Sequence, residues 1–171
     1  MNLVKKSLKN WIPFIVTVVI MAFVINKFLF FEILVPSGSM YPTIKPNDRI
    51  ITTRIHNVKK IKRGEILVFY SNEFQETMVK RVIGLPNDSV EIKENGSVFI
   101  NGHMLDETYV KYPDNRTGKF KVPNGKYLFL GDYRQHSLDS RLWKDPFISE
   151  KNIKGKAVFI VFPFNRASTL R

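Results

Sequence analysis

The chain begins with a short polar stretch that is followed by a long apolar one. Residues 11–31 are almost wholly apolar, whereas residues 1–10 contain three Lys and no acidic residue. A helix over residues 11–31 would be ~31 Å long, about the thickness of the hydrocarbon core of a bilayer. The pattern predicts a transmembrane helix at residues 11–31, with a tail at 1–10 and a domain at 32–171.

The charges that flank this stretch predict its orientation. Basic residues precede it and few charges follow it directly, so the positive-inside rule puts the N-terminus in the cytoplasm. The expected location is the cell membrane, as a single-pass type II protein with its domain on the extracytoplasmic face. A cleavable signal peptide is the alternative. The stretch is longer than a usual signal and no Ala-x-Ala-like site follows it, which favours a retained anchor.

The remainder of the chain has the pattern of an all-β domain. Short runs rich in Val, Ile and Phe are separated by Pro, Gly, Asn and Asp, and no amphipathic helix period appears. Residues 106–124 are polar and contain several turn residues, which predicts a long loop or small satellite lobe. The expected architecture is a β-barrel or a folded sheet. Strands are predicted at residues 49–54, 65–70, 77–83, 90–93, 98–100, 127–130 and 156–162.

Composition adds a basic surplus to this picture. The chain has 27 Lys and Arg against 15 Asp and Glu, a formal net charge of +12. A membrane-tethered basic β-domain that binds nucleic acid or another anionic polymer without catalysis would have this charge. A domain resting on anionic lipid headgroups would have it too. The basic residues are scattered and no RNA-binding motif is recognisable, so we expect the bilayer and its headgroups, and no nucleic acid, as the partner.

The available residue types restrict the chemistry. The chain contains no Cys, which excludes disulfides, a Cys nucleophile and thiolate metal sites. We expect neither a metal nor another cofactor.

Ser39 is the candidate nucleophile. It belongs to residues 36–43, which closely follow the apolar stretch, so its chemistry would take place near the membrane surface. At ~3.3 Å per extended residue, Ser39 lies at most about 25 Å beyond it. A catalytic serine needs a base, and three His are available. His56 and His103 have surroundings typical of solvated side chains. His136 has Asp139 nearby, so a Ser39-His136-Asp139 triad stays open.

Lys80 is the other candidate base. In a strand over residues 77–83, its side chain shares a face with Met78 and Val82, whereas Arg81 points to the other face. Burial among apolar side chains can lower the pKa of a Lys by up to 3–5 units. A buried Lys80 would therefore be available as a free amine near neutral pH.

Three segments together resemble one protein family. They are Pro36-Ser37-Gly38-Ser39-Met40-Tyr41-Pro42-Thr43, then Lys80-Arg81-Val82-Ile83-Gly84-Leu85-Pro86-Asn87-Asp88, and then Gly131-Asp132-Tyr133-Arg134 through Ser137-Leu138-Asp139-Ser140-Arg141. Their order, spacing and preceding apolar stretch resemble the bacterial type I signal peptidases, which are membrane-bound Ser/Lys proteases. The short chain is similar to the compact form associated with Gram-positive bacteria.

The resemblance implies a role for each motif. Ser39 would be the nucleophile and Lys80 the general base, with an oxyanion hole made by the Ser39 N–H and the Ser37 hydroxyl. Ser137 would hydrogen-bond and orient the Lys80 amine. Asp139 and Arg141 would form an ion pair, which is needed because a carboxylate in contact with Lys80 would raise the pKa of the base. A catalytically dead relative acting as a scaffold would not require the intact Ser39 and Lys80.

The resemblance also implies a substrate. The family cleaves signal-peptide-bearing preproteins after small residues at −3 and −1, bound as an extended strand. The residues expected to wall the pockets are Val35, Pro36, Met40, Ile44 and Val79. Two positions depart from the family pattern. Asn87 replaces a usual Gly in a tight turn, which Asn tolerates, and Tyr133 replaces a common Asn.

Overall fold

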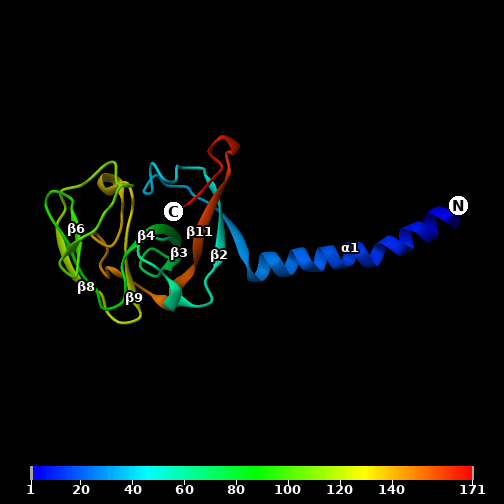
Figure 1. Ribbon diagram of the computed structural model, residues 1–171, viewed down its shortest axis with the longest axis horizontal. Coiled ribbons are helices and arrows are strands. Elements are labelled where there is room, and N and C mark those ends of the chain that lie inside the picture. The colour runs from blue at the N-terminus through cyan, green and yellow to red at the C-terminus, as the bar shows by residue number, and fades with distance from the viewer. Residues whose placement is uncertain (1, 171) are drawn as a thin grey trace.

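A long N-terminal helix leads into a β domain. The computed structural model describes residues 2–170, and in the helix it describes the side chains of residues 11–23 and 28. Helix α1 (Asn2–Phe28) projects away from the domain, with the N-terminus at its far end (Figure 1). The Lys side chains of the tail predicted at residues 1–10 lie outside the described residues.

Within the described part of the chain, no helix combines the length and the apolar character that crossing a membrane requires.

The helix starts and ends earlier than predicted: α1 begins at Asn2 rather than at residue 11, so the predicted tail is part of the helix. Helix α1 ends at Phe28, and Phe30 and Phe31 already belong to strand β1 (Phe30–Leu34). Two contacts hold this junction: the Leu29 carbonyl accepts the Arg54 N–H at 2.9 Å, and the Phe28 carbonyl lies 3.1 Å from His56 Nε2. The apolar run continues from helix into strand, so hydropathy alone does not mark the boundary.

The main sheet has eight strands in the order β1-β2-β11-β3-β4-β9-β10, with β12 paired to β11. Adjacent strands are antiparallel. The pairing path is open at β1 and β10, so the folded-sheet alternative is correct and the closed barrel is wrong. The strands are β1, β2 (Arg49–Arg54), β3 (Ile66–Ser71), β4 (Glu76–Gly84), β9 (Lys126–Leu130), β10 (Phe147–Ser149), β11 (Ile153–Phe162) and β12 (Ser168–Thr169).

A second sheet forms the satellite lobe, at the end of the domain away from α1 (Figure 1). Its order is β7-β6-β5-β8, so the lobe draws on more of the chain than residues 106–124. Gly84 lies where the chain passes between the sheets, and a Cβ there would come within 2.8 Å of Val122. The strands are β5 (Ser89–Ile92), β6 (Val98–Ile100), β7 (His103–Met104) and β8 (Gly118–Lys121).

All seven predicted strands are present, with ends shifted by up to three residues. The strands that the pattern missed are β1, which continues the apolar run, and β7, β8, β10 and β12, which have two to four residues each. Such short strands carry too few alternating positions to be recognised. Short 3₁₀ turns complete the domain: η1 (Val58–Lys60), η2 (Arg134–His136), η3 (Glu150–Asn152) and η4 (Phe164–Arg166).

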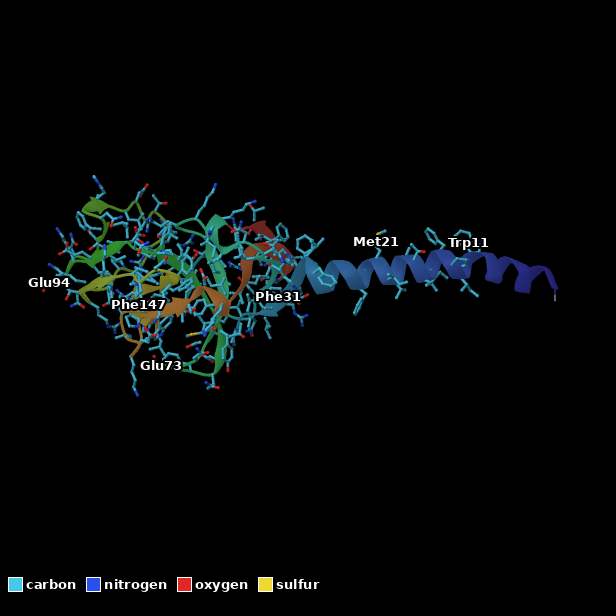
Figure 2. The ribbon with its side chains drawn as sticks, turned by 90° about the horizontal axis from the view of Figure 1, so that it is seen from below. Trp11, Met21, Phe31, Glu73, Glu94 and Phe147 are labelled. Carbon is cyan, nitrogen blue, oxygen red and sulfur yellow. The ribbon has the colours of Figure 1, made fainter. Side chains whose placement is uncertain are left out.

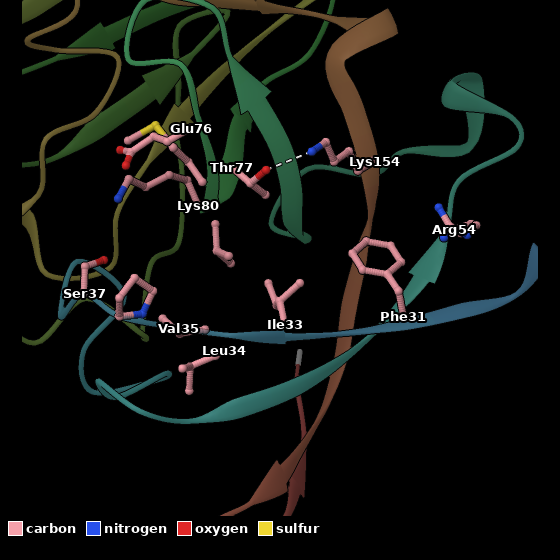
Figure 3. Close-up of a pocket in the computed structure, with 13 residues that line it drawn as sticks. Phe31, Ile33, Leu34, Val35, Ser37, Arg54, Glu76, Thr77, Lys80 and Lys154 are labelled. Carbon is pink, nitrogen blue, oxygen red and sulfur yellow. Dashed lines mark hydrogen bonds between the residues drawn. The ribbon is translucent and has the colours of Figure 1, made fainter. Parts of the chain in front are cut away.

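Two strand edges are left open beside each other. Strand β1 is the end of the main sheet, with β2 on one side only. Strand β4 pairs with β3 through residues 76–81, but with β9 only from Arg81 onwards. Among the described strands, the other edge of residues 76–80 therefore has no partner. Figure 3 shows the segment from Thr77 to Lys80 facing the β1 segment around Ile33 across a groove.

Candidate active site

The loop between β1 and β2 presents Ser39 at the end of this groove. The Val35 N–H donates to the Asp48 carbonyl at 2.9 Å, which closes the base of the loop. The Ser39 carbonyl accepts the Tyr133 N–H at 3.0 Å, which links the loop to the segment after β9. A Cβ on Gly131 would lie 2.5 Å from that same carbonyl oxygen. The close approach of the two segments therefore requires glycine at position 131.

Lys80 lies directly against Ser39. Its Nζ donates to the Ser39 Oγ, and both side chains are buried, with Lys80 3% and Ser39 7% exposed. Burial lowers the pKa of Lys80 from 10.5 to about 8, although the charges of Asp139, Glu76 and Asp132 oppose this. Among the described ion pairs, none includes Lys80. The amine thus has the buried surroundings that the strand pattern predicted.

Ser37 lies beside Ser39. Its Oγ lies 3.4 Å from the Ser39 Oγ. A hydroxyl at this distance is close enough to reach an oxygen that forms on a carbonyl attacked by Ser39.

Asp139 forms the expected ion pair with Arg141. The Arg141 Nε donates to Asp139 Oδ1 at 2.8 Å, and the Gly131 N–H donates to Oδ2 at 3.0 Å. Burial by itself would raise the pKa of the Asp139 carboxyl, but these hydrogen bonds and the Arg141 charge outweigh burial and lower it. Asp139 therefore stays ionised without being the partner of Lys80.

The expected hydrogen bond between Ser137 and the Lys80 amine is absent. Ser137 is 2% exposed and makes no hydrogen bond to Lys80 among the described residues, but its hydroxyl lies close enough to Asp139 to help lower the pKa of that carboxyl. The hydroxyl lies against Gly131, where a Cβ would be 2.1 Å from it. The Ser137 side chain thus occupies the space where a Cβ of residue 131 would lie.

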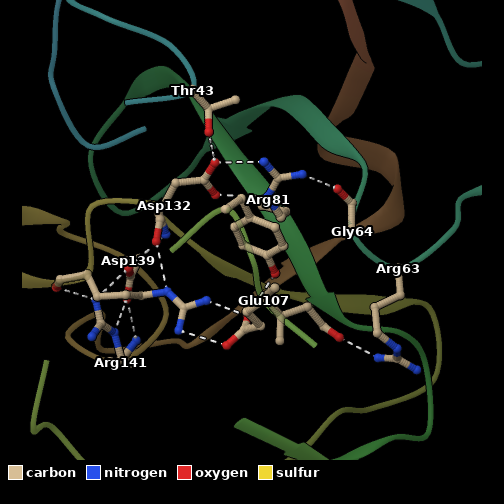
Figure 4. A network of polar contacts seen from close by, with 12 residues as sticks. Thr43, Arg63, Gly64, Arg81, Glu107, Asp132, Asp139 and Arg141 are labelled. Carbon is tan, nitrogen blue, oxygen red and sulfur yellow. Dashed lines mark hydrogen bonds and ion pairs between the residues drawn. The ribbon is translucent and has the colours of Figure 1, made fainter. Parts of the chain in front are cut away.

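A buried ion-pair network lies on the other face of β4, and the sequence did not reveal it (Figure 4). Arg81 donates to both Asp132 oxygens, at 2.8 and 2.6 Å. The Thr43 hydroxyl donates to the same carboxylate at 2.5 Å. Each of the three motifs contributes one of these residues, so the network fixes the motifs relative to one another. The signal in the sequence was the alternation of β4, which points Arg81 away from Lys80.

A second pair continues the network towards the loop before β8. Arg134 Nη2 donates to Glu107 Oε1 at 2.5 Å, and its Nε donates to the Gly131 carbonyl at 3.0 Å. Arg141 also pairs with Asp114 at 3.0 Å. These contacts hold the third motif from both ends.

The His residues do not assemble a triad. His136 is exposed and its ring lies 4.8 Å from that of Tyr133, while Asp139 is engaged by Arg141. His56 contacts the end of α1, and His103 is exposed in β7. Lys80 is therefore the base candidate that the structure brings to Ser39. In the described part of the chain, no cluster of three or more His, Cys, Asp or Glu could hold a metal ion.

The groove between β1 and β4 contains a cavity of about 510 Å³ (Figure 3). Of the expected pocket residues, Val35, Pro36 and Val79 line it. Met40 and Ile44 are instead 1% and 0% exposed in the hydrophobic core. They pack beneath the loop in the same core cluster as Val35, and they do not line the cavity.

A second cavity of about 310 Å³ lies at Ser39 and Lys80 and extends towards the segment after β9. Ser37, Ser39 and Lys80 line it, together with Tyr133 and His136. Tyr133, one of the two departures, belongs to an aromatic cluster, with ring centroids 4.7 Å from Tyr112 and 5.8 Å from Tyr41. The other departure, Asn87, has φ 72°, the left-handed conformation expected of a Gly replacement.

A family model described as "Signal peptidase, peptidase S26" matches residues 8–162. The chain belongs to this family. A signal peptidase I from Bacillus licheniformis is 38% identical over 175 residues, covering 94% of this chain and 92% of that protein. "Signal peptidase I S" from Bacillus subtilis is 36% identical with the same coverage.

A solved structure agrees with these relatives. The crystal structure of a signal peptidase I from Enterococcus faecalis matches with a TM-score of 0.50 and 31% identity, over 58% of this chain and 98% of that one. The resemblance and the class of serine endopeptidase are confirmed. Membership in a peptidase family argues against a basic domain that only binds anionic polymers.

Proposed function

We propose that this peptidase removes N-terminal signal peptides from secreted preproteins, using Ser39 and Lys80 as a catalytic dyad. The contact between a buried amine and the Ser39 hydroxyl is the observation that carries the proposal. The relatives named signal peptidase I support the substrate class.

The chemistry follows from the protonation of Lys80. With its pKa lowered to about 8, the amine is partly unprotonated near neutral pH and accepts the Ser39 proton. The Ser39 oxygen attacks the scissile carbonyl carbon, and the oxyanion is stabilised by the Ser39 N–H and the Ser37 hydroxyl. The Lys80 ammonium then protonates the leaving amine. Water attacks the acyl-enzyme with Lys80 again as base, which restores Ser39.

The groove supports binding of the substrate as an extended strand. The open edges of β1 and β4 offer backbone groups on both sides. Val35 and Val79 narrow the cavity beside the nucleophile, which favours small side chains at −1 and −3. Ser137 and the ion pair of Asp139 with Arg141 would support the site by holding the third motif against the loop of Ser39.

The exposed face of α1 supports attachment to the bilayer. Ten of its side chains between Trp11 and Phe23 are apolar and 48–63% exposed, and Figure 2 shows Trp11 and Met21 well away from the domain. We propose that this segment anchors the protein, with the N-terminus cytoplasmic and the domain near the anionic headgroups of the opposite surface. The cleavage site of a preprotein held in the same bilayer would then lie close to the groove.

The test is cleavage of a model preprotein in lipid vesicles. Ser39→Ala and Lys80→Ala are each expected to lower the rate by at least about 10³-fold, whereas His136→Ala keeps most of the activity. In the wild type, kcat/KM should rise with pH to a plateau above a pKa of about 8. An active Lys80→Ala with an inactive His136→Ala would contradict the dyad, and an inactive wild type would contradict the function.

A further inference from the structure

Glu76 is a carboxylate of the groove that the proposed mechanism does not use. It begins β4, and strand alternation puts its side chain on the same face as Met78 and Lys80. Figure 3 shows Glu76 and Lys80 on one side of the groove. Glu76 is exposed, and the ion pairs found among the described residues do not include it. Its charge is therefore available to a bound molecule.

Glu76 lines both cavities at the catalytic pair. It is the one acidic residue among those that line either cavity. The larger cavity extends along β1 towards Phe31 and Arg54, where α1 ends. On the proposed function, this side holds the substrate segment that precedes the cleaved bond. The second cavity, which extends from Ser39 towards the chain after β9, then receives the segment that follows the bond.

The second cavity combines two groups that suit a cation. Glu76 supplies a negative charge, and Tyr133 supplies an aromatic ring already packed against other rings. A Lys or Arg side chain gains from a carboxylate and from the face of an aromatic ring. His136 and Lys80 also line this cavity, but Lys80 is only 3% exposed whereas Glu76 is exposed, so Glu76 is the charge that a solvated substrate side chain meets first.

We infer that Glu76 and Tyr133 form a subsite for a positively charged side chain, Lys or Arg, in the first residues after the cleaved bond. The inference rests on the proposed function and adds to it a preference on the product side. An acidic side chain at the same place would be repelled by Glu76. The ratio of kcat/KM for a Lys over a Glu substrate should be about three- to fivefold, the size expected for a solvent-accessible ion pair.

The experiment compares preproteins that differ at one position. Lys, Gln or Glu is placed in turn at each of the first four positions after the cleaved bond. Each set is cleaved by the full-length wild type, by Glu76→Gln and by the control Glu94→Gln. Glu94 lies at the far end of the domain (Figure 2), so its loss removes the same charge at a distance from the groove.

At one or more positions, the wild type and Glu94→Gln should prefer Lys over Glu, and Glu76→Gln should lose this preference. Comparing substrates on one enzyme cancels any general effect of Glu76 on Lys80. The wild-type preference should also fall as salt increases, a readout that needs no variant to fold. Three results would overturn the inference: equal rates for all substrate charges, a Lys preference that salt does not change, or a Lys preference that Glu76→Gln retains. In each case, cleavage of the Gln substrate would still support the proposed function. Failure of the wild type to cut any preprotein would overturn both.

Discussion

The two faces of β4 bury neighbouring cations in opposite ways. Lys80 meets a serine hydroxyl and no carboxylate, and its pKa falls. Arg81, the next residue, is 2% exposed and is held by both oxygens of Asp132. Lys80 lowers the free-energy cost of its burial by releasing a proton more readily. Arg81 lowers that cost by forming an ion pair with Asp132.

This difference explains why each residue type stands where it does. An Arg guanidinium does not lose its proton in proteins, so it suits the paired face and could not act as a base. A Lys amine loses its proton readily when buried. Exchange of the two types would therefore damage both faces, although it conserves the charge.

Removing the paired cation tests the structural face and should have the largest effect on stability. Arg81→Met leaves Asp132 buried without its partner, which typically costs about 3–5 kcal/mol. Urea unfolding of the full chain measures the loss. Arg81→Met combined with Asp132→Asn is the control, because it removes both charges and should recover a substantial part of the stability. A double variant as unstable as the single one would show that packing, not charge, maintains this face.

Removing Lys80, which has no ionic partner among the described ion pairs, should increase the free energy of unfolding rather than decrease it. A folded-state pKa of about 8 against 10.5 means that the unfolded chain binds more protons between these values. The stability of the wild type should therefore rise as pH increases from about 8 to 10.5. Lys80→Met should be more stable than the wild type at pH 7, by about 1–3 kcal/mol.

Thermal unfolding of the wild type and of Lys80→Met from about pH 7 to 10.5 measures both the pH dependence and the difference in stability. Lys80→Met also serves as the control, because its stability should not show the rise with pH that Lys80 causes. A Lys80→Met variant less stable than the wild type at pH 7 would mean that the amine is adequately solvated or paired.

A pair on the surface supplies the smallest effect. Arg49 and Glu32 lie 3.1 Å apart with side chains 55% and 44% exposed. Such pairs contribute little because water and salt screen them. Glu32→Gln should change the free energy of unfolding by less than about 0.5 kcal/mol in the same urea experiment. A loss near that of Arg81→Met would show that pairing matters equally at the surface and in the interior.

The sequence predicted those parts of the site that depend on local rules. Strand alternation separated Lys80 from Arg81, and the motifs identified the ion pair of Asp139 with Arg141. The left-handed turn at Asn87 was also predictable, since few other residues adopt it readily. These features need only the neighbouring residues or a recognised motif.

Other parts depend on packing between distant segments. The apolar pattern does not distinguish Met40 and Ile44, which lie only in the core, from Val35, which also lines the groove. The position of Ser137 depends on the missing side chain at Gly131, and the partner of Arg81 lies 51 residues away in Asp132. The open strand edges and the location of Glu76 between two cavities follow from the topology of the sheet.

The junction of α1 and β1 has a mechanical consequence. Only Leu29 separates the end of the helix from the strand that walls the groove, and its carbonyl is tied to β2. A tilt of the helix would be transmitted directly to β1, because there is no flexible linker between the two elements. Under the proposed attachment to a bilayer, a change in bilayer thickness that tilts α1 would therefore change the width of the groove.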